Sequence, residues 1–338
     1  MSRKAYCSLE ALEEIFDDPA TYADLYHIVR DYHDVVLNLP EVALEKALQA
    51  NPYVRSLHKR GTYGVDCETA FCNGLPDDLE SITAGGLFIL DQPPPVCARL
   101  AARHGICVLS VQDPSPAQTL TTHYYRQMEK ADTYEALTAS GAAHGWPALL
   151  VPMGKLPMNS LLVVDNYLFS SLRDGKRNLL SLLDGLLPTT LHEEFHLLLV
   201  TTNPRNVLSQ EVLATLFSEI RTSLNRPYSI DMGLLTHGDG DRRFHRRAWV
   251  SNYHFGSSDR GFACFTEDGR VNAHNDIRIQ GAFRDARVPY GDVPWRSMQL
   301  ELKSAAALRQ HNQEQGGWMA TNLLYGNCNN RLLDLAAL

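Results

Sequence analysis

The sequence predicts an α/β protein in two parts: a mixed helical and β-α-β domain over residues 1–150, then a more regular α/β domain over residues 155–338. The length of 338 residues exceeds that of one small domain. Short apolar runs alternate with segments of helical periodicity, which is typical of sheets built from parallel strands. Prolines and glycines cluster between residues 145 and 158, and this composition favours a domain boundary there.

The first sixty residues are expected to form a small helical lobe. Apolar side chains recur three or four residues apart over residues 9–48, which is the spacing of one helix face. An apolar run follows, then a helix at residues 96–104 that Gly105 ends, then a second apolar run at residues 106–111. These elements predict a β-α-β unit. Residues 113–147 predict a polar helical segment among prolines and glycines.

The C-terminal domain repeats strand and helix in the order β-α-β-α-β-β, followed by a hairpin and a final helix. Apolar runs predict the strands, and helical spacing with capping signals predicts the helices. The predicted strands cover residues 160–164, 195–202, 228–235 and 244–253, and the hairpin covers residues 262–271. The predicted helices cover residues 178–187, 209–224 and 295–311.

Composition excludes several classes of protein. With 44% hydrophobic and 21% charged residues, the chain has the composition of a globular protein and not of a fibrous or disordered one. No apolar run is long enough to span a membrane, and the N-terminus lacks a secretory signal pattern, so we expect a cytoplasmic protein. The seven cysteines form no CxxC pair and are expected to be reduced thiols. P-loop, GxGxxG and GxSxG motifs are absent, and the sequence predicts no cofactor.

One short motif resembles that of the zinc metallopeptidases. His192, Glu193 and His196 match HExxH, in which two histidines on one helix face bind zinc and the glutamate activates water. Glu211 or Glu219 would have to supply a third ligand. The residues that follow His196 favour a buried strand over further helical turns. We therefore expect no metal at these histidines, and the metallopeptidase stays an alternative.

A second motif has the pattern H-x-R-x4-N. It consists of His245, Arg247 and Asn252 in the last of the predicted strands. The pattern resembles the H-x-K-x4-D signature of the phospholipase D superfamily, with arginine replacing lysine and asparagine replacing aspartate. The resemblance implies a phospholipase D-like domain, because each half of those proteins has the β-α-β-α-β-β order predicted for residues 160–253. The stretch also resembles uncharacterised bacterial phospholipase D-like proteins, which implies, by association, a role in antiviral defence.

The chemistry that this resemblance implies is the binding or cleavage of a phosphodiester. His245 would attack phosphorus, Arg247 would bind the nonbridging oxygens, and Asn252 would orient the imidazole. On a strand, His245 and Arg247 would point to the same face and could reach one phosphate. Further phosphate contacts are expected from neighbouring arginines and from an acidic residue at a strand end, namely Arg242, Arg243, Arg246, Arg260 and Asp165.

The arginines around His245 also predict a partner. Because the net charge is -8, nucleic acid would be bound locally at this basic patch and not over a general basic surface. Phospholipase D enzymes need two histidines and the chain carries one copy of the motif, so cleavage would require a homodimer with facing sites. The third hypothesis is a non-enzymatic module that binds lipid headgroups or a protein partner. In that case His245 would lie on an exposed basic turn.

Overall fold

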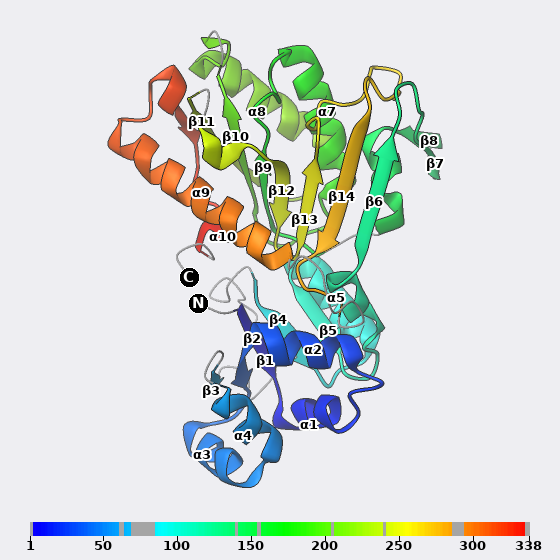
Figure 1. Cartoon of the computed structure of the whole chain (residues 1–338), viewed down its shortest axis with the longest axis vertical. Helices are drawn as coiled ribbons and strands as arrows, with labels where there is room; N and C mark the ends of the chain where they lie inside the picture. The colour runs from blue at the N-terminus through cyan, green and yellow to red at the C-terminus, as the bar shows by residue number, and fades with distance from the viewer. Residues whose placement is uncertain are drawn as a thin grey trace.

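The computed structural model describes residues 3–60, 64–68, 85–138, 141–153, 157–203, 206–238, 241–285 and 294–334. A parallel sheet forms in the N-terminal half and a larger mixed sheet in the C-terminal half. Figure 1 shows the N-terminal sheet and its helices at one end of the molecule and the larger sheet at the other. The α/β class predicted from the sequence is confirmed.

The N-terminal sheet consists of parallel strands in the order β3-β2-β1-β4-β5. Its strands are β1 (Arg3–Cys7), β2 (His33–Leu37), β3 (Val65–Cys67), β4 (Leu87–Leu90) and β5 (Cys107–Ser110). The prediction of a purely helical lobe for the first sixty residues is wrong, because β1 and β2 lie within it. β2 begins directly after a helix with no glycine or proline between them, so the sequence carries no turn signal at that boundary.

The described helices of this half connect its strands. They are α1 (Leu9–Asp17), α2 (Ala23–Tyr32), α3 (Glu41–Ala50), α4 (Pro52–Lys59) and α5 (Pro94–His104). The Ser8 hydroxyl caps α1 by accepting a hydrogen bond from the Ala11 amide. Gly105 ends α5 with a φ of 61°, the left-handed conformation that commonly closes a helix. β4, α5 and β5 form the predicted β-α-β unit, which is confirmed.

The segment predicted to be polar and helical is largely extended. Its elements are the 3-10 helix η2 (Ser115–Leu120), β6 (His123–Met128), β7 (Glu135–Thr138), β8 (Gly141–His144) and the short helix α6 (Trp146–Leu150). β7 and β8 pair with each other, whereas β6 pairs with β14 of the C-terminal sheet. The C-terminal sheet therefore takes one strand from before residue 150, the predicted end of the N-terminal domain.

The C-terminal sheet has the strand order β15-β11-β10-β9-β12-β13-β14-β6. Its strands besides β6 are β9 (Ser160–Val164), β10 (Phe195–Thr202), β11 (Ile230–His237), β12 (Arg247–Ser251), β13 (His254–Ser258), β14 (Asn275–Gly281) and β15 (Leu324–Gly326). β9, β10 and β11 run parallel, and β12 is antiparallel to β9. With the helices α7 (Leu172–Leu186) and α8 (Gln210–Leu224), the predicted β-α-β-α-β-β order is confirmed.

Three predicted strand segments of this domain are wrong in their bounds. The strand predicted for residues 228–235 covers Ile230–His237. The strand predicted for residues 244–253 starts only at Arg247, because the 3-10 helix η5 (Arg242–Phe244) precedes it. The hairpin predicted for residues 262–271 is reduced to an isolated bridge between Phe265 and Val271. The hairpin in this region is instead β12–β13, in which Gly256 leaves room for the ring of Trp249 opposite.

Helices cover both faces of the C-terminal sheet. α6, α7 and α8 share one apolar cluster with Leu161, Val163 and Trp249. α9 (Pro294–Glu314) and α10 (Arg331–Asp334) share the other with Leu162 and Val164. Alternate residues of β9 thus serve opposite faces, as the pleat of a strand requires. Within the described ranges, no helix combines the length and the apolar character needed to cross a membrane.

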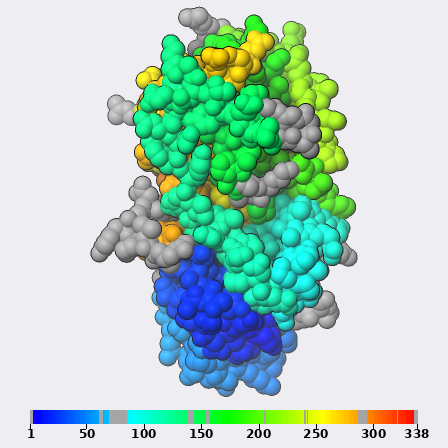
Figure 2. Space-filling view, turned by 90° about the vertical axis from the view of Figure 1, so that its right-hand side faces the viewer, coloured from blue at the N-terminus to red at the C-terminus, as the bar shows by residue number. Residues whose placement is uncertain are grey.

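The two halves meet at the amino edge of the C-terminal sheet. The Tyr253 hydroxyl donates to the Gly86 carbonyl oxygen at 2.6 Å and accepts from the Cys107 amide at 2.8 Å. Arg3 of β1 donates to the Asn252 carbonyl oxygen at 2.7 Å. In Figure 2 the blue and cyan N-terminal residues lie directly against the green residues of the other half. These contacts leave the opposite, carboxyl edge of the sheet away from the N-terminal half (Figure 1).

Candidate functional site

The carboxyl ends of β9, β10 and β11 lie at one edge of the C-terminal sheet, and β12 begins at the same edge. Ligands of open α/β sheets bind in this position, outside the carboxyl ends of the strands. The arrangement gathers Asp165, Thr202, His237 and Arg247 from separate parts of the sequence. We call this region the carboxyl edge; it comprises residues 165–167, 202–203, 237–238, 243–247 and 259–262.

Asp165 anchors the backbone of the carboxyl edge. Its side chain is buried, and its two oxygens accept hydrogen bonds from the Tyr167 amide at 2.9 Å and the Phe262 amide at 2.7 Å. Burial raises the pKa of Asp165, while the two N–H donors and the charge of Arg247 act in the opposite direction. The prediction of Asp165 as a phosphate contact is wrong, because both oxygens are occupied by backbone donors and a carboxylate repels a phosphate.

Two threonines of β10 fix the neighbouring backbone. The Thr201 hydroxyl donates to the Asp165 carbonyl oxygen at 2.8 Å, and the Thr202 hydroxyl donates to that of Asn166 at 2.5 Å. These bonds hold the start of the loop that carries Tyr167. The aromatic ring of Tyr167 is therefore presented from a fixed backbone, and the residue is 56% exposed.

Arg247 is the predicted site residue that the structure places best for binding an anion. It is half-buried at the start of β12, and its Nη1 donates to the Asp259 carbonyl oxygen at 2.9 Å. Its guanidinium carbon lies 5.2 Å from the ring centroid of Tyr167, within the range of a cation–π contact. Arg247 and Tyr167 thus form a paired cation and aromatic ring at the carboxyl edge.

The other predicted arginines do not converge on Arg247. Arg243 forms an ion pair with Asp241 at 2.6 Å. Arg246 donates to the Ser297 hydroxyl at 3.1 Å. Ser297 belongs to α9, which covers the face of the sheet opposite to that of Trp249. Arg260 is exposed, and its backbone amide donates to Asn275. The side chain of Arg242 lies outside the described residues.

The structure separates His245 from Asn252. His245 is exposed and helical in conformation, two residues before β12, so the alternation of a strand does not place it on the face of Arg247. Asn252 lies beyond the other end of β12, about 16 Å from Arg247 at the usual rise per residue. The prediction that Asn252 orients His245 is therefore wrong.

Asn252 instead joins strand ends inside the protein. Its Oδ1 accepts from the amides of Asn159 and Ser160 at 3.0 and 3.2 Å, and its Nδ2 donates to the Asn159 side chain at 2.8 Å. The residue is fully buried. Its role in this structure is to satisfy backbone donors at the amino end of β9.

His237 is a candidate that the sequence reasoning did not select. It ends β11, is buried, and stacks on Phe244 with ring centroids 4.7 Å apart. Its Nε2 lies 3.0 Å from Asn166 Oδ1, and its Nδ1 lies 3.0 Å from the Gly238 carbonyl oxygen. The sequence signal that could have found His237 is its position at the end of a predicted parallel strand. Ligands of open α/β sheets bind there, and the same reasoning selected Asp165.

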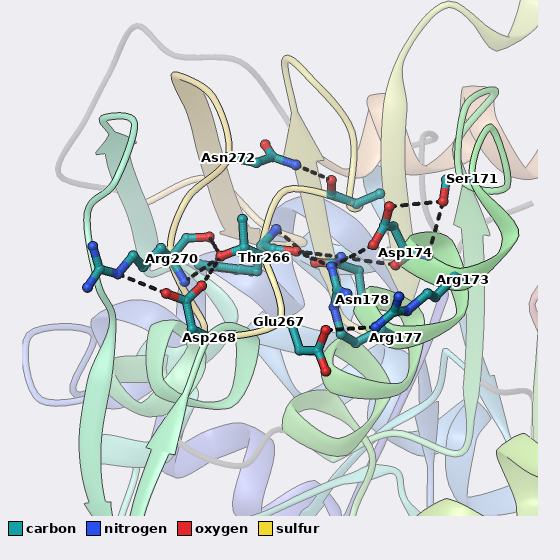
Figure 3. A network of polar contacts seen from close by, with 12 residues as sticks. Ser171, Arg173, Asp174, Arg177, Asn178, Thr266, Glu267, Asp268, Arg270 and Asn272 are labelled. Atoms are coloured by element: carbon teal, nitrogen blue, oxygen red, sulfur yellow. Dashed lines mark hydrogen bonds and ion pairs between the residues drawn. The ribbon is translucent and has the colours of Figure 1, made fainter.

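A polar network fastens the loop after Gly261 to the start of α7 (Figure 3). The Asn178 side chain accepts from the Phe265 amide at 2.9 Å and donates to the Phe265 carbonyl oxygen at 2.9 Å. Arg177 donates to the same carbonyl at 2.9 Å, and Arg173 pairs with Glu267 at 2.8 Å. This network fixes residues 265–267, which follow the turn that the Asp165 carboxylate holds through the Phe262 amide.

The HExxH residues do not form a helix. His192 is exposed before β10, Glu193 lies 2.7 Å from Nδ1 of His104, and His196 is on the strand itself. The predicted buried strand at residues 195–202 is confirmed, and with it the two histidines lose the shared helix face that a metallopeptidase uses. Of the proposed third ligands, Glu219 pairs with Lys176 at 2.8 Å. The metallopeptidase alternative is therefore set aside.

In comparisons with known proteins, no protein-family model matches the chain and no curated protein matches it at a significant level.

Proposed function

We propose that the chain binds single-stranded nucleic acid through its phosphodiester backbone at the carboxyl edge of the C-terminal sheet. The observation that carries this proposal is the pairing of Arg247 with the exposed ring of Tyr167. A guanidinium binds nonbridging phosphate oxygens in a planar, bidentate geometry. An exposed aromatic ring stacks on a base of any identity, and proteins that bind single strands combine these two kinds of side chain.

The fold supports the same ligand class. The β-α-β-α-β-β order resembles that of a phospholipase D-like domain, whose ligand is a phosphodiester. We propose that the C-terminal domain is phospholipase D-like. The carboxyl edge is also the position at which open α/β sheets bind their ligands.

The geometry favours binding over cleavage. A phosphohistidine mechanism needs an imidazole held in a fixed orientation and a second group that protonates the leaving oxygen. His245 is exposed on a turn, and Asn252 is buried at the far end of β12. We therefore propose a degenerate site that holds the strand without cutting it. Binding of this kind does not need the homodimer that cleavage would require, and the role in antiviral defence stays a prediction.

Fluorescence anisotropy with a short labelled oligonucleotide, as DNA and as RNA, tests the proposal. Replacing Arg247 or Tyr167 by alanine should weaken binding about tenfold, the usual effect of losing one phosphate or stacking contact. Tyr125→Ala is the matched control, because Tyr125 is 53% exposed and also lies beside an arginine, Arg278, at 5.6 Å. Equal losses in the control, or unchanged binding by Arg247→Ala, would contradict the proposal.

The same oligonucleotides test whether the site cleaves. We expect the wild-type protein to leave them intact, with or without a chelator. If the wild type cleaves them and His245→Ala does not, the binding-only proposal is overturned in favour of phospholipase D-type hydrolysis. Binding that depends on Arg247 with no cleavage would support it.

A further inference from the structure

A second cluster of polar side chains lies at the amino edge of the C-terminal sheet. Glu194, His196 and Asp231 each offer one ligand atom there, and these atoms all lie within 4.8 Å of one another. Glu194 directly precedes β10 and His196 is the second residue of that strand; Glu194 Oε2 lies 3.7 Å from His196 Nε2. The parallel register pairs His196 with Asp231 of β11. Strand pairing therefore brings an imidazole and two carboxylates together.

This cluster is separate from the proposed nucleic-acid site. His196 and Thr202 stand near opposite ends of β10, about 20 Å apart at the usual rise of a strand. A cavity of about 350 Å³ adjoins the cluster, and it is lined by Glu194 and Asp231 together with Tyr228, Ser229 and two arginines, Arg221 and Arg226. The Glu194 side chain is 45% exposed, so an ion from solvent can reach it.

We propose that Glu194, His196 and Asp231 bind a divalent transition-metal ion, for which zinc is the reference. Zinc accepts imidazole nitrogen and carboxylate oxygen as ligands, and three protein ligands leave a further position for water or another molecule. The adjoining cavity is where such a molecule would lie. Calcium and magnesium are less suited, because they prefer sites made entirely of oxygen atoms.

Neighbouring groups orient two of the ligands. The Asn327 side-chain amide donates to the Asp231 carboxylate, and the Ser229 hydroxyl donates to Glu194 Oε1 at 3.3 Å. Hydrogen bonds of this kind hold metal ligands in position and raise affinity. Arg331 Nη1 donates to the Glu194 carbonyl oxygen at 2.6 Å, and this places a positive charge beside the cluster that repels a metal cation. We therefore expect weaker binding than at a closed structural zinc site.

The proposal differs from the HExxH hypothesis in its ligands. In that hypothesis His192 and Glu193 act together with His196, whereas here Glu193 is bound to His104 and His192 stands outside the cluster. The residues that replace them are Glu194, which follows Glu193 directly, and Asp231 of the next strand. His192→Ala is therefore a matched control for His196→Ala.

Equilibrium dialysis of the full chain against zinc chloride, followed by metal analysis, tests the site. We expect one zinc ion per chain for the wild type and for His192→Ala. His196→Ala and Asp231→Asn should each lower the affinity at least about tenfold, because loss of a mere hydrogen-bond partner of a metal ligand already costs that much. The proposal is overturned if His196→Ala retains wild-type zinc, or if His192→Ala loses as much as His196→Ala.

Cobalt substitution gives a second, spectroscopic readout. Cobalt(II) with a low coordination number absorbs visible light strongly. We expect this visible absorption with the wild type and with His192→Ala but not with Asp231→Asn. Circular dichroism of each variant shows whether it folds. A folded Asp231→Asn protein with the wild-type cobalt spectrum would also overturn the proposal.

Discussion

The carboxylate of Asp165 lies so close to Gly261 that a β-carbon at position 261 would stand 2.6 Å from Oδ2. Gly261 also has a φ of 99°, a conformation that side chains rarely adopt. The same carboxylate binds the amide of Phe262. Because Gly261 has no side chain, the buried Asp165 carboxylate can approach the backbone and hold the turn at residues 261–262.

Gly261→Ala should destabilise the protein by about 1–3 kcal/mol, because it combines an unfavourable φ with a contact against a buried carboxylate. The measurement is the free energy of unfolding in urea. Gly238→Ala is the control, since a β-carbon there meets no atom within 4 Å and the residue has no positive φ. Similar losses in both variants would show that the contact with Asp165 is not the cause.

Asn252→Ala should cost about 2–4 kcal/mol of stability, because it leaves the buried amides of Asn159 and Ser160 without an acceptor. His245→Ala should change stability by less than about 0.5 kcal/mol, as expected for an exposed residue. Urea unfolding of the two variants checks the assignment. If His245→Ala proves as destabilising as Asn252→Ala, the exposed position described for His245 is wrong.

Glu301 of α9 should make stability depend on pH. The residue is buried with Oε2 unpartnered, and burial raises its pKa from 4.5 to about 7, with Arg246 opposing the shift. Between these two values the folded protein binds more protons than the unfolded chain, so stability should fall as the pH rises from 4.5 to 7 and then level off. Both states are protonated below this range.

Glu301→Gln mimics the protonated acid and should remove this fall. We expect the variant to be more stable than the wild type above pH 7, by about 1–3 kcal/mol, and close to it at acidic pH. Urea unfolding at both pH values provides the measurement. Glu314→Gln, at the exposed end of the same helix, is the control and should change neither value. A Glu301→Gln variant that is less stable at high pH would refute the prediction.

Salt dependence should distinguish Arg247 from Arg243. If Arg247 contacts a phosphate, Arg247→Ala should reduce the slope of log affinity against log salt by about 0.7, the value for one single-strand phosphate contact. Arg243→Ala should reduce it less, because Asp241 already neutralises that guanidinium. Titrations at several salt concentrations measure both slopes. If Arg243→Ala changes the slope more than Arg247→Ala does, the phosphate is not bound at Arg247.

The sequence by itself predicted the elements whose signals are local. The apolar runs of β9 and β10 appear with the predicted bounds, and Ser209 caps α8 by accepting from the Val212 amide. The strand at β10 was also enough to reject a helical HExxH site. Such signals act within a few residues, because side-chain periodicity and helix caps depend on near neighbours along the chain.

Only the tertiary structure decided which residues meet. Asn252 matches a motif position, yet its partner is Asn159, which strand order places beside it from 93 positions away. Register alone set Asp231 beside His196, and the ends of separate strands brought Arg247 to Asp165 and Tyr167. Hydrogen-bond partners and charge neighbours across a sheet depend on strand order and register, which no local pattern in this chain specifies.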